Sequence, residues 1–288
     1  MAETQSAQPL EVRNISDTAR WAAYFRAQET KRSDAIFRDP YAERLCGQHG
    51  VDIANTLPDG NKHAWAWVTR TYLFDHFITQ ELQRGVDLVL NLAAGLDARP
   101  YRMKLPASLQ WIEVDLPDLL AYKTRLLTGE RPVCALERIP LDLSNGSERR
   151  TLFERVASRA KKVLILSEGL LIYLTADEVG ALARDLAANR TFERWIVDLA
   201  SPGLLQLLQR RMGAMVSEAG APYKFAPPEG PAFFERYGWK PIDVQSVLDA
   251  AARARRLPLF LRLMSILPQP KGRRRIWSGV CLLQRLQS

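Results

Sequence analysis

The stretch VDLVLNLAAGLDARPYRMKLPASLQWIEVD, residues 86–115, decides the fold of this chain. Two apolar runs, 86–92 and 109–114, have the length and composition of buried strands, and a helix-like connection lies between them. A turn of small residues follows the first run, and Asp115 ends the second. In an open α/β sheet, such a turn lets a nucleoside-bearing cofactor approach the backbone, while the acidic side chain accepts hydrogen bonds from ribose hydroxyls. The stretch therefore predicts a nucleoside cofactor.

The composition of the turn narrows the choice of cofactor. Residues 93–97 read AAGLD, with Gly95 as the single glycine, whereas a turn that binds a dinucleotide normally needs three. Asp97 adds a negative charge that would repel a diphosphate but would tolerate or attract a sulfonium ligand that carries an ammonium group. The turn thus favours S-adenosylmethionine over NAD. The alternative is a buried strand with an acidic exit in a domain without a cofactor.

Apolar runs predict seven strands in all. After the first two, they lie at residues 136–141, 163–166, 195–199, 239–244 and 276–283. Helical patterns of crossover length separate the first five strands, at residues 117–128, 146–160 and 176–189. One helix, 245–256, and a long connection containing LPLFLRLMSILP separate the last two strands. This alternation predicts an α/β fold with a mostly parallel sheet and helices on both faces, and seven strands are typical of a class I methyltransferase (Rossmann-like) core.

Residues 1–84 are expected to form a helical cap. Ser16 and Asp17 can cap a first helix, Asp39-Pro40 marks a break, and a later helix at 64–83 leads to the first strand. Because no Gly/Ser-rich linker follows, we expect the cap to share one domain with the core, residues 85–288. An insertion at about 201–237, before the sixth strand, holds a helix near 204–218 and a Pro/Gly-rich stretch. Its length predicts a lid over the substrate side.

Composition excludes several classes of protein. The 288 residues are 47% hydrophobic, enough for a sizeable core, yet no apolar run approaches the ~18 residues of a membrane-spanning helix. The first residues, MAETQSAQPLEVR, have neither the basic start nor the apolar core of a signal peptide, so we expect a cytoplasmic protein without a membrane partner. The three cysteines and three histidines lie at spacings that predict neither disulfides nor a metal site.

The net charge of +8 raises the possibility of nucleic-acid binding. Basic residues cluster at 253–256 and at 271–275. The second cluster lies between Pro270 and the last predicted strand, where a solvated hairpin loop is expected, and no aromatic stacking run accompanies it. A solvated basic face is therefore the favoured interpretation, and nucleic acid is not the expected partner. A nucleic-acid modifier that uses this surface is kept as an alternative function.

Several motifs occur together in a characteristic order. They are NISDTARWAAYFRAQETKRSDAIFRDPYAERL, VTRTYLFD, NLAAGLDARPYR, EVDLPDLLAYK, PLDL and LILSEGLLIYL. In these motifs, and over nearly its whole length, the chain resembles the leucine carboxyl methyltransferase family, especially its bacterial S-adenosylmethionine-dependent branch. The most specific motifs are GLDARPYR with EVDLP, and SEGLLIYL. The likeness is loose after residue 201, where substrate identity would be determined.

The resemblance implies a set of cofactor-binding residues: Arg70, Ala93, Gly95, Asp115, Asp142, Leu143 and Glu168. In this set, Arg70 would pair with the methionyl carboxylate and Glu168 would lie under the methionyl amino group. Asp115 would hold the ribose hydroxyls, and Asp142 with the backbone of Leu143 would face the adenine. Taken singly, Arg70 could equally be a surface arginine and Glu168 a helix cap.

The chain departs from the family pattern at two positions. The family usually has glycine where this chain has Ala93, and threonine where it has Ala98. A β-carbon at Ala93 narrows the approach of a ligand to the backbone and disfavours a positive φ. Loss of the hydroxyl at position 98 removes one potential hydrogen bond at a helix start. A cofactor-binding member with little activity is therefore a second alternative.

The histidine positions bear on the methyl acceptor. Methyl transfer from a sulfonium needs alignment and exclusion of water, and a carboxylate acceptor is already ionised, whereas a hydroxyl requires a base. All three histidines precede the first strand. This favours O-methylation of a carboxylate or another ionised oxygen, on a small molecule or a peptide C-terminus, without a dedicated catalytic base. Tyr173 and, from the cap, Tyr24 and Trp21 are predicted to line the acceptor pocket.

Overall fold

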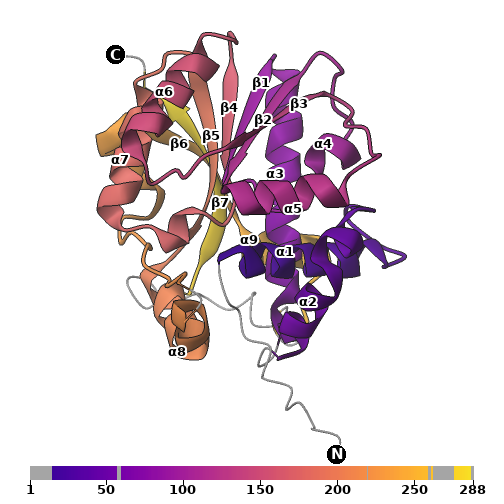
Figure 1. Ribbon diagram of the computed structural model, residues 1–288. Coiled ribbons are helices and arrows are strands. Elements are labelled where there is room, and N and C mark those ends of the chain that lie inside the picture. Colours follow the sequence, from indigo (N-terminus) through magenta and orange to yellow (C-terminus); the bar gives the residue numbers. More distant parts are fainter. Residues whose placement is uncertain (1–14, 57–59, 219, 259–260, 262–275, 287–288) are drawn as a thin grey trace, which may run out of the picture.

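The computed structural model describes residues 15–56, 60–218, 220–258, 261 and 276–286, and its strands form one sheet (Figure 1). The strands are β1 (Leu88–Leu92), β2 (Gln110–Asp115), β3 (Ala135–Pro140), β4 (Val163–Ser167), β5 (Phe192–Ala200), β6 (Trp239–Ser246) and β7 (Ser278–Arg285). Their order is β3-β2-β1-β4-β5-β7-β6, and β7 runs antiparallel to both of its neighbours. The other pairs are parallel. The predicted seven-stranded, mostly parallel sheet is confirmed.

The strand order reverses at β1, which lies between β2 and β4. In open α/β sheets, ligands bind outside the carboxyl ends of the strands at such a reversal. The register brings these ends to one level, since Leu92 pairs with Val114 of β2 and Asn91 with Leu166 of β4. The turn after β1, Asp115 and the exit of β4 therefore lie side by side.

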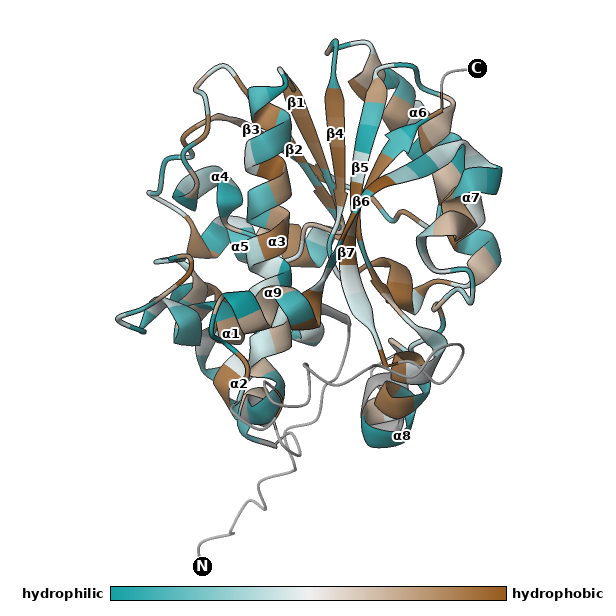
Figure 2. Cartoon of the chain, turned by 180° about the vertical axis from the view of Figure 1, so that it is seen from behind, coloured by the Kyte–Doolittle hydropathy of each residue, from teal (hydrophilic) through white to brown (hydrophobic). Residues whose placement is uncertain are grey.

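Helices cover both faces of the sheet (Figures 1 and 2). One face carries α3 (Ala64–Gln83), α4 (Arg99–Arg102), α5 (Pro117–Leu126) and α9 (Val247–Arg253), and the other carries α6 (Gly146–Ala157) and α7 (Ala176–Ala187). Because successive side chains of a strand point to opposite faces, Leu88, Leu90 and Leu92 enter the core with α6 and α7, while Val89 packs with α3. Both faces of β1 are thus buried, which explains its continuous apolar sequence.

The N-terminal cap has its own apolar core. Helices α1 (Ile15–Thr30) and α2 (Ala42–Thr56) meet through Trp21, Phe25 and Leu45, which pack with Val68 of α3 and Leu119 of α5. The prediction that Ser16 and Asp17 cap the first helix is wrong, because α1 already includes Ile15. The buried Asp17 carboxylate instead contacts His49 Nε2 on α2 at 3.1 Å.

The segment between β5 and β6 holds α8 (Pro202–Glu218) and the 3-10 helix η3 (Gly230–Tyr237). The backbone N–H groups of Lys224 and Phe225 donate to the Ile172 carbonyl, in the η2 turn (Leu171–Tyr173) that follows β4. Phe225 also packs with Phe233 and Phe234 in the main core. The insertion is therefore anchored next to the exit of β4.

The ends of the chain bear on several predictions. Arg256 does not belong to a solvated basic face, because its guanidinium pairs with the buried Glu29 at 2.8 Å. The basic cluster at 271–275 and most of the connection at 257–268 lie outside the described residues.

No helix in the described part of the chain is long and apolar enough to span a membrane. Within the same residues, no group of three His, Cys, Asp or Glu could hold a metal ion. All three cysteines are buried and unpaired.

Candidate functional site

A cavity of about 1160 Å³ opens at the carboxyl ends of the strands, between the cap and α8. All seven predicted cofactor-binding residues line it: Arg70, Ala93, Gly95, Asp115, Asp142, Leu143 and Glu168. They come from α3 and from the exits of β1, β2, β3 and β4. The structure thus brings together residues that lie as far as 98 positions apart in the sequence.

Asp115 braces the turn after β1. Its Oδ2 accepts a hydrogen bond of 2.6 Å from the Gly95 N–H, and its Oδ1 accepts one of 2.7 Å from the Leu116 N–H. Each carboxylate oxygen keeps acceptor capacity for a further donor, such as a ribose hydroxyl. Burial raises the pKa of Asp115 above its ordinary value, and the two backbone donors oppose this shift. The side chain has the chemistry and position expected for a diol partner.

Two residues of the turn adopt the left-handed conformation. Ala93 has φ 53° and Gly95 has φ 50°. A β-carbon on Gly95 would lie 3.3 Å from Ala19 Cβ, so the glycine allows α1 to close over the turn. Ala93 adopts the positive φ that its β-carbon was expected to disfavour. For a residue other than glycine, this conformation costs about 1–2 kcal/mol.

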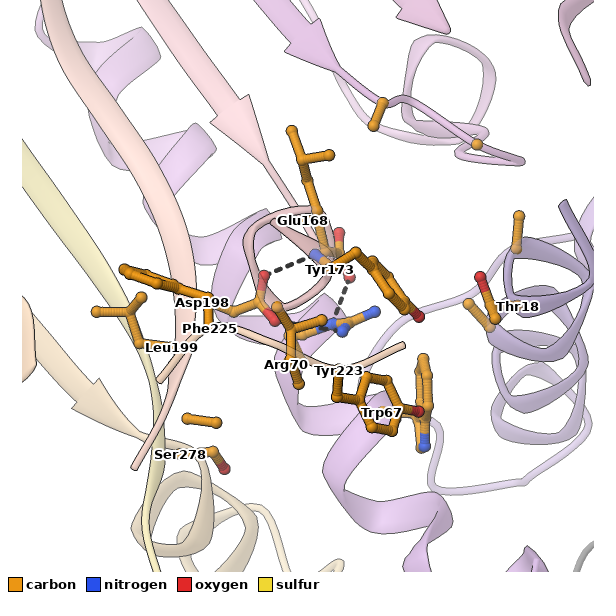
Figure 3. Close-up of a pocket in the computed structure, with 18 of the residues that line it drawn as sticks. Thr18, Trp67, Arg70, Glu168, Tyr173, Asp198, Leu199, Tyr223, Phe225 and Ser278 are labelled. Carbon is orange, nitrogen blue, oxygen red and sulfur yellow. Dashed lines mark hydrogen bonds and ion pairs between the residues drawn. The ribbon is translucent and has the colours of Figure 1, made fainter. Parts of the chain in front are cut away.

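Arg70 lies between two carboxylates at the exits of β4 and β5 (Figure 3). Its Nε is 3.1 Å from Glu168 Oε1 and its Nη1 is 3.3 Å from Asp198 Oδ2. Burial by itself raises the pKa of Glu168, but Arg99 and Arg70 outweigh burial and hold that pKa below its ordinary value. Burial raises the pKa of Asp198 above its ordinary value. The charge of Arg70 and the hydrogen bond from the Gly169 N–H oppose this rise. This end of the cavity presents a charge-paired surface that suits a zwitterionic group.

Arg99 links three elements in the wall of the cavity. Its Nη2 lies 2.8 Å from Glu168 Oε2, its Nη1 2.8 Å from Asp97 Oδ2 and its Nε 2.6 Å from Asp75 Oδ1. Burial raises the pKa of Asp97, but Arg99 overcomes this and holds it well below its ordinary range. Asp97 lines the cavity and its charge is paired with Arg99, so the expectation that it tolerates or attracts a sulfonium stays a prediction. Asp97 also caps α4 by accepting from the Arg99 N–H at 2.8 Å, because the N-cap Ala98 has no side-chain acceptor.

Asp142 and Leu143 lie where β3 ends. The Asp142 side chain accepts a hydrogen bond of 2.9 Å from the Ser144 N–H, and the Leu143 carbonyl accepts one of 2.6 Å from Arg149 Nη1. These bonds fix the loop, which forms the wall of the cavity opposite Glu168. A flat heterocycle at this wall would meet backbone and an acidic side chain.

The predicted acceptor-pocket residues separate into two groups. Trp21 and Tyr173 line the cavity, and the Tyr173 ring lies 5.6 Å from that of Tyr223. Burial raises the pKa of both tyrosines, so their hydroxyls stay protonated at neutral pH. The prediction for Tyr24 is wrong. The cavity-facing Ala22 lies two residues before it, about 200° away around α1, and Tyr24 is buried in the core of the cap.

Sequence reasoning missed Arg99 and Asp198. Arg99 is part of a motif that pointed to the cofactor turn, but its bonds to Asp75 and Glu168 depend on tertiary contact. Asp198 had a detectable signal, because it is the only charged residue in the apolar run 195–200 of β5. A charge within a buried strand is costly unless it is paired, and here Arg70 and the Gly169 N–H supply the pairing.

The family model described as leucine carboxyl methyltransferase matches residues 19–187, more than half of the chain. The chain belongs to the leucine carboxyl methyltransferase family. A relative from Parafrankia sp. is 30% identical over 271 residues, covering 85% of this chain and 83% of its own length. One from Streptomyces coelicolor is 30% identical over 263 residues, covering 88% and 90%. Both carry the name "Putative S-adenosyl-L-methionine-dependent methyltransferase".

Solved structures support the fold of this methyltransferase. A DUF574 family protein from Streptomyces avermitilis superposes with a TM-score of 0.58 at 11% identity, covering 93% of this chain and 97% of its own. A protein from Thermobifida fusca gives a TM-score of 0.57 at 13% identity, covering 92% and 94%. The predicted family and the class I methyltransferase fold are confirmed. The family match ends at residue 187, before α8 begins.

Proposed function

We propose that this methyltransferase binds S-adenosylmethionine in the cavity and transfers its methyl group to a carboxylate oxygen. The observation that carries the proposal is the convergence of the Gly95 turn, Asp115 and the Arg70–Glu168 pair on one cavity. Asp115 receives the ribose hydroxyls, and the loop at Asp142 receives the adenine. The names of the two relatives support the same cofactor.

The methionyl end of the cofactor fits the charges of the site. Arg70 presents a planar donor fork to a carboxylate, and Glu168 presents an acceptor to an ammonium group. A zwitterion adds no net charge to this paired surface, so it binds without leaving a buried charge uncompensated.

Carboxylate methylation needs little from the protein beyond alignment. Bound S-adenosylmethionine supplies the methyl group on a sulfonium, and the cavity residues align the acceptor and exclude water. Among the three histidines, only His63 lines the cavity, and it lies 3.2 Å from Arg211. Both side chains are exposed, at the rim of the cavity. Tyr173 and Tyr223 offer neutral hydroxyls, which suit an acceptor that loses its charge during the reaction.

The direct test combines calorimetry with a transfer assay. The protein is titrated with S-adenosylmethionine and with S-adenosylhomocysteine, and both should bind to one site per chain. Methyl-labelled cofactor is then incubated with a library of carboxylic acids and hydroxyl compounds. Failure of both ligands to bind overturns the cofactor assignment, whereas transfer to hydroxyls alone overturns the carboxylate assignment.

Ala93→Gly is expected to tighten S-adenosylhomocysteine binding several-fold, because removal of the β-carbon widens the closest approach to the turn. Relief of the strained φ offsets the entropy that glycine adds to the unfolded chain, so the free energy of unfolding should change by less than about 1 kcal/mol. Calorimetry and thermal unfolding measure the two quantities. Ala98→Gly is the control, since Ala98 is not among the cavity-lining residues and has φ −115°, so glycine there should only destabilise. Unchanged affinity in Ala93→Gly shows that the β-carbon does not limit approach.

The catalytic rate is expected to be nearly flat between about pH 6.5 and 8.5, where a carboxylate of ordinary pKa near ~4 stays ionised. A hydroxyl acceptor with a general base would instead give a rate that rises about tenfold per pH unit below the pKa of that base. Single-turnover rates across this range distinguish the two. The product should be a methyl ester that releases methanol in mild alkali. A steep ascending limb or an alkali-stable product contradicts the carboxylate assignment.

A further inference from the structure

Helix α8 presents an apolar stripe to the cavity. Its cavity-lining residues are Leu204, Leu207, Leu208, Arg211 and Met212, at the spacing of one helix face. A surface helix normally buries such a stripe against the core. In the described part of the chain, α8 makes no extensive contact with another helix or strand, and Figure 1 shows it set apart from the sheet. All five of these residues face the cavity, and the four apolar ones are only half-buried.

The rest of this part of the cavity is also apolar. In the described part of the chain, its other lining residues include Trp65 and Trp67 of α3, Tyr223 and Phe225 of the insertion, and Trp277 next to β7. Within the described residues, charged side chains mark its two ends, and Glu178 and Asp249 also line the cavity. The inner end holds the paired Arg70, Glu168 and Asp198, and the rim holds Arg211 beside His63. We call the space between these ends the apolar chamber.

The size of the chamber follows from α3 and from the volume of the whole cavity. His63, the residue just before α3, and Arg70 lie seven residues apart, which corresponds to about 10 Å along the helix axis. The cavity volume of about 1160 Å³ exceeds the range of ~300–1,000 Å³ that is typical for one drug-sized ligand. A cofactor held at the turn after β1 therefore leaves room for a second, apolar molecule.

We propose that the methyl acceptor is a carboxylic acid with an apolar body, which lies against the leucines of α8 while its carboxylate reaches the tyrosines at the inner end. This inference rests on the proposed function. In the transfer, the bond from sulfur to the methyl carbon breaks as the bond from the carboxylate oxygen to that carbon forms. Sulfur keeps the electron pair, the acceptor loses its negative charge, and no proton moves. A peptide would have to leave backbone amides unpaired in the chamber, which is costly.

The acceptor class is tested by titrating the protein, preloaded with S-adenosylhomocysteine, with three probes: decanoate, naphthoate and a short peptide that ends in leucine. We expect the two apolar acids to bind and the peptide to bind at least tenfold more weakly. The same three compounds are then offered with methyl-labelled S-adenosylmethionine, and esters should form on the apolar acids. Binding and methylation of the peptide in preference to both acids overturns the proposal.

Matched variants on α8 locate the acid. Leu207→Asp, which puts a charge into the chamber, should weaken binding of the apolar acids at least tenfold. Gln206→Asp places a charge of the same sign on the exposed side of α8, and this variant should bind the apolar acids like the wild type. S-adenosylhomocysteine affinity should stay at the wild-type value in both. If Leu207→Asp does not fold, Leu207→Asn serves in its place.

The outcomes separate this inference from the proposed function. Wild-type acid affinity in Leu207→Asp, with cofactor binding intact, overturns the apolar chamber as the acceptor site and leaves the cofactor assignment standing. Failure of S-adenosylhomocysteine to bind the wild-type protein overturns both.

Discussion

Asp115→Ala is expected to weaken S-adenosylhomocysteine binding by roughly 30- to 150-fold, about 2–3 kcal/mol. The substitution removes the proposed partner of the ribose hydroxyls. It also leaves the N–H groups of Gly95 and Leu116 without their acceptor, and this loosens the turn that the cofactor approaches. Calorimetry measures the affinity, and thermal unfolding reports whether the turn is still part of a folded protein.

Two further variants calibrate the Asp115 result. Asp115→Asn keeps one carbonyl acceptor but loses the charge, so its affinity should fall between wild type and Asp115→Ala. Asp118→Ala removes an exposed carboxylate three residues later, in the first turn of α5, and should have no effect. Wild-type affinity in Asp115→Ala would show that this carboxylate serves the turn alone.

Arg70→Lys is expected to weaken S-adenosylhomocysteine binding by roughly 10- to 100-fold, about 1.4–2.8 kcal/mol. Lysine replaces the planar fork with a point charge that cannot pair with Glu168, Asp198 and a ligand carboxylate together. The control is Arg84→Lys at the end of the same helix, where an exposed arginine pairs with Glu81. That variant should bind like the wild type.

A truncated ligand separates the roles of the two residues. Methylthioadenosine keeps the ribose and adenine but lacks the amino-acid end of the cofactor. Arg70→Lys should leave its affinity unchanged, whereas Asp115→Ala should weaken it as strongly as it weakens S-adenosylhomocysteine. An equal loss for both ligands in Arg70→Lys would mean that Arg70 supports the fold of the site instead of binding the methionyl carboxylate.

The strands and the cofactor end could be predicted from the sequence for a physical reason. The central parallel strands β1 and β4 are buried along their whole length and read as continuous apolar runs, whereas the edge strands β3 and β6 are only partly buried and were detectable from shorter apolar runs. Once the strands were known, Gly95, Asp115 and Glu168 had to meet, because the carboxyl ends of parallel strands lie at one edge of the sheet. Local sequence and the topology of the sheet were together sufficient to predict the cofactor end of the cavity.

The wrong and missing assignments involve contacts between distant parts of the chain. The prediction that Tyr24 lines the acceptor pocket failed because the sequence of an aromatic-rich helix does not reveal which face meets the cavity. The ion pair between Asp97 and Arg99 was not predicted, although both residues belong to one motif. Arg99 acquires its role from Glu168 on another element, and Asp198, although its charge stood out in an apolar run, pairs with Arg70, which lies 128 positions away in the sequence. Charge pairing of this kind becomes visible only in three dimensions.

The bonds of Arg99 to Asp75, Asp97 and Glu168 suggest an order of events during turnover. They join α3, the turn after β1 and the exit of β4 through the protein's own side chains, so the cofactor meets walls that these ion pairs already hold in place. Among the described residues, α8 makes no extensive contact with another helix or strand, so the wall on the acceptor side must lose motional freedom when a molecule settles against it. This asymmetry favours a compulsory sequence in which the cofactor enters first and the acceptor second, with the ester leaving before the spent cofactor.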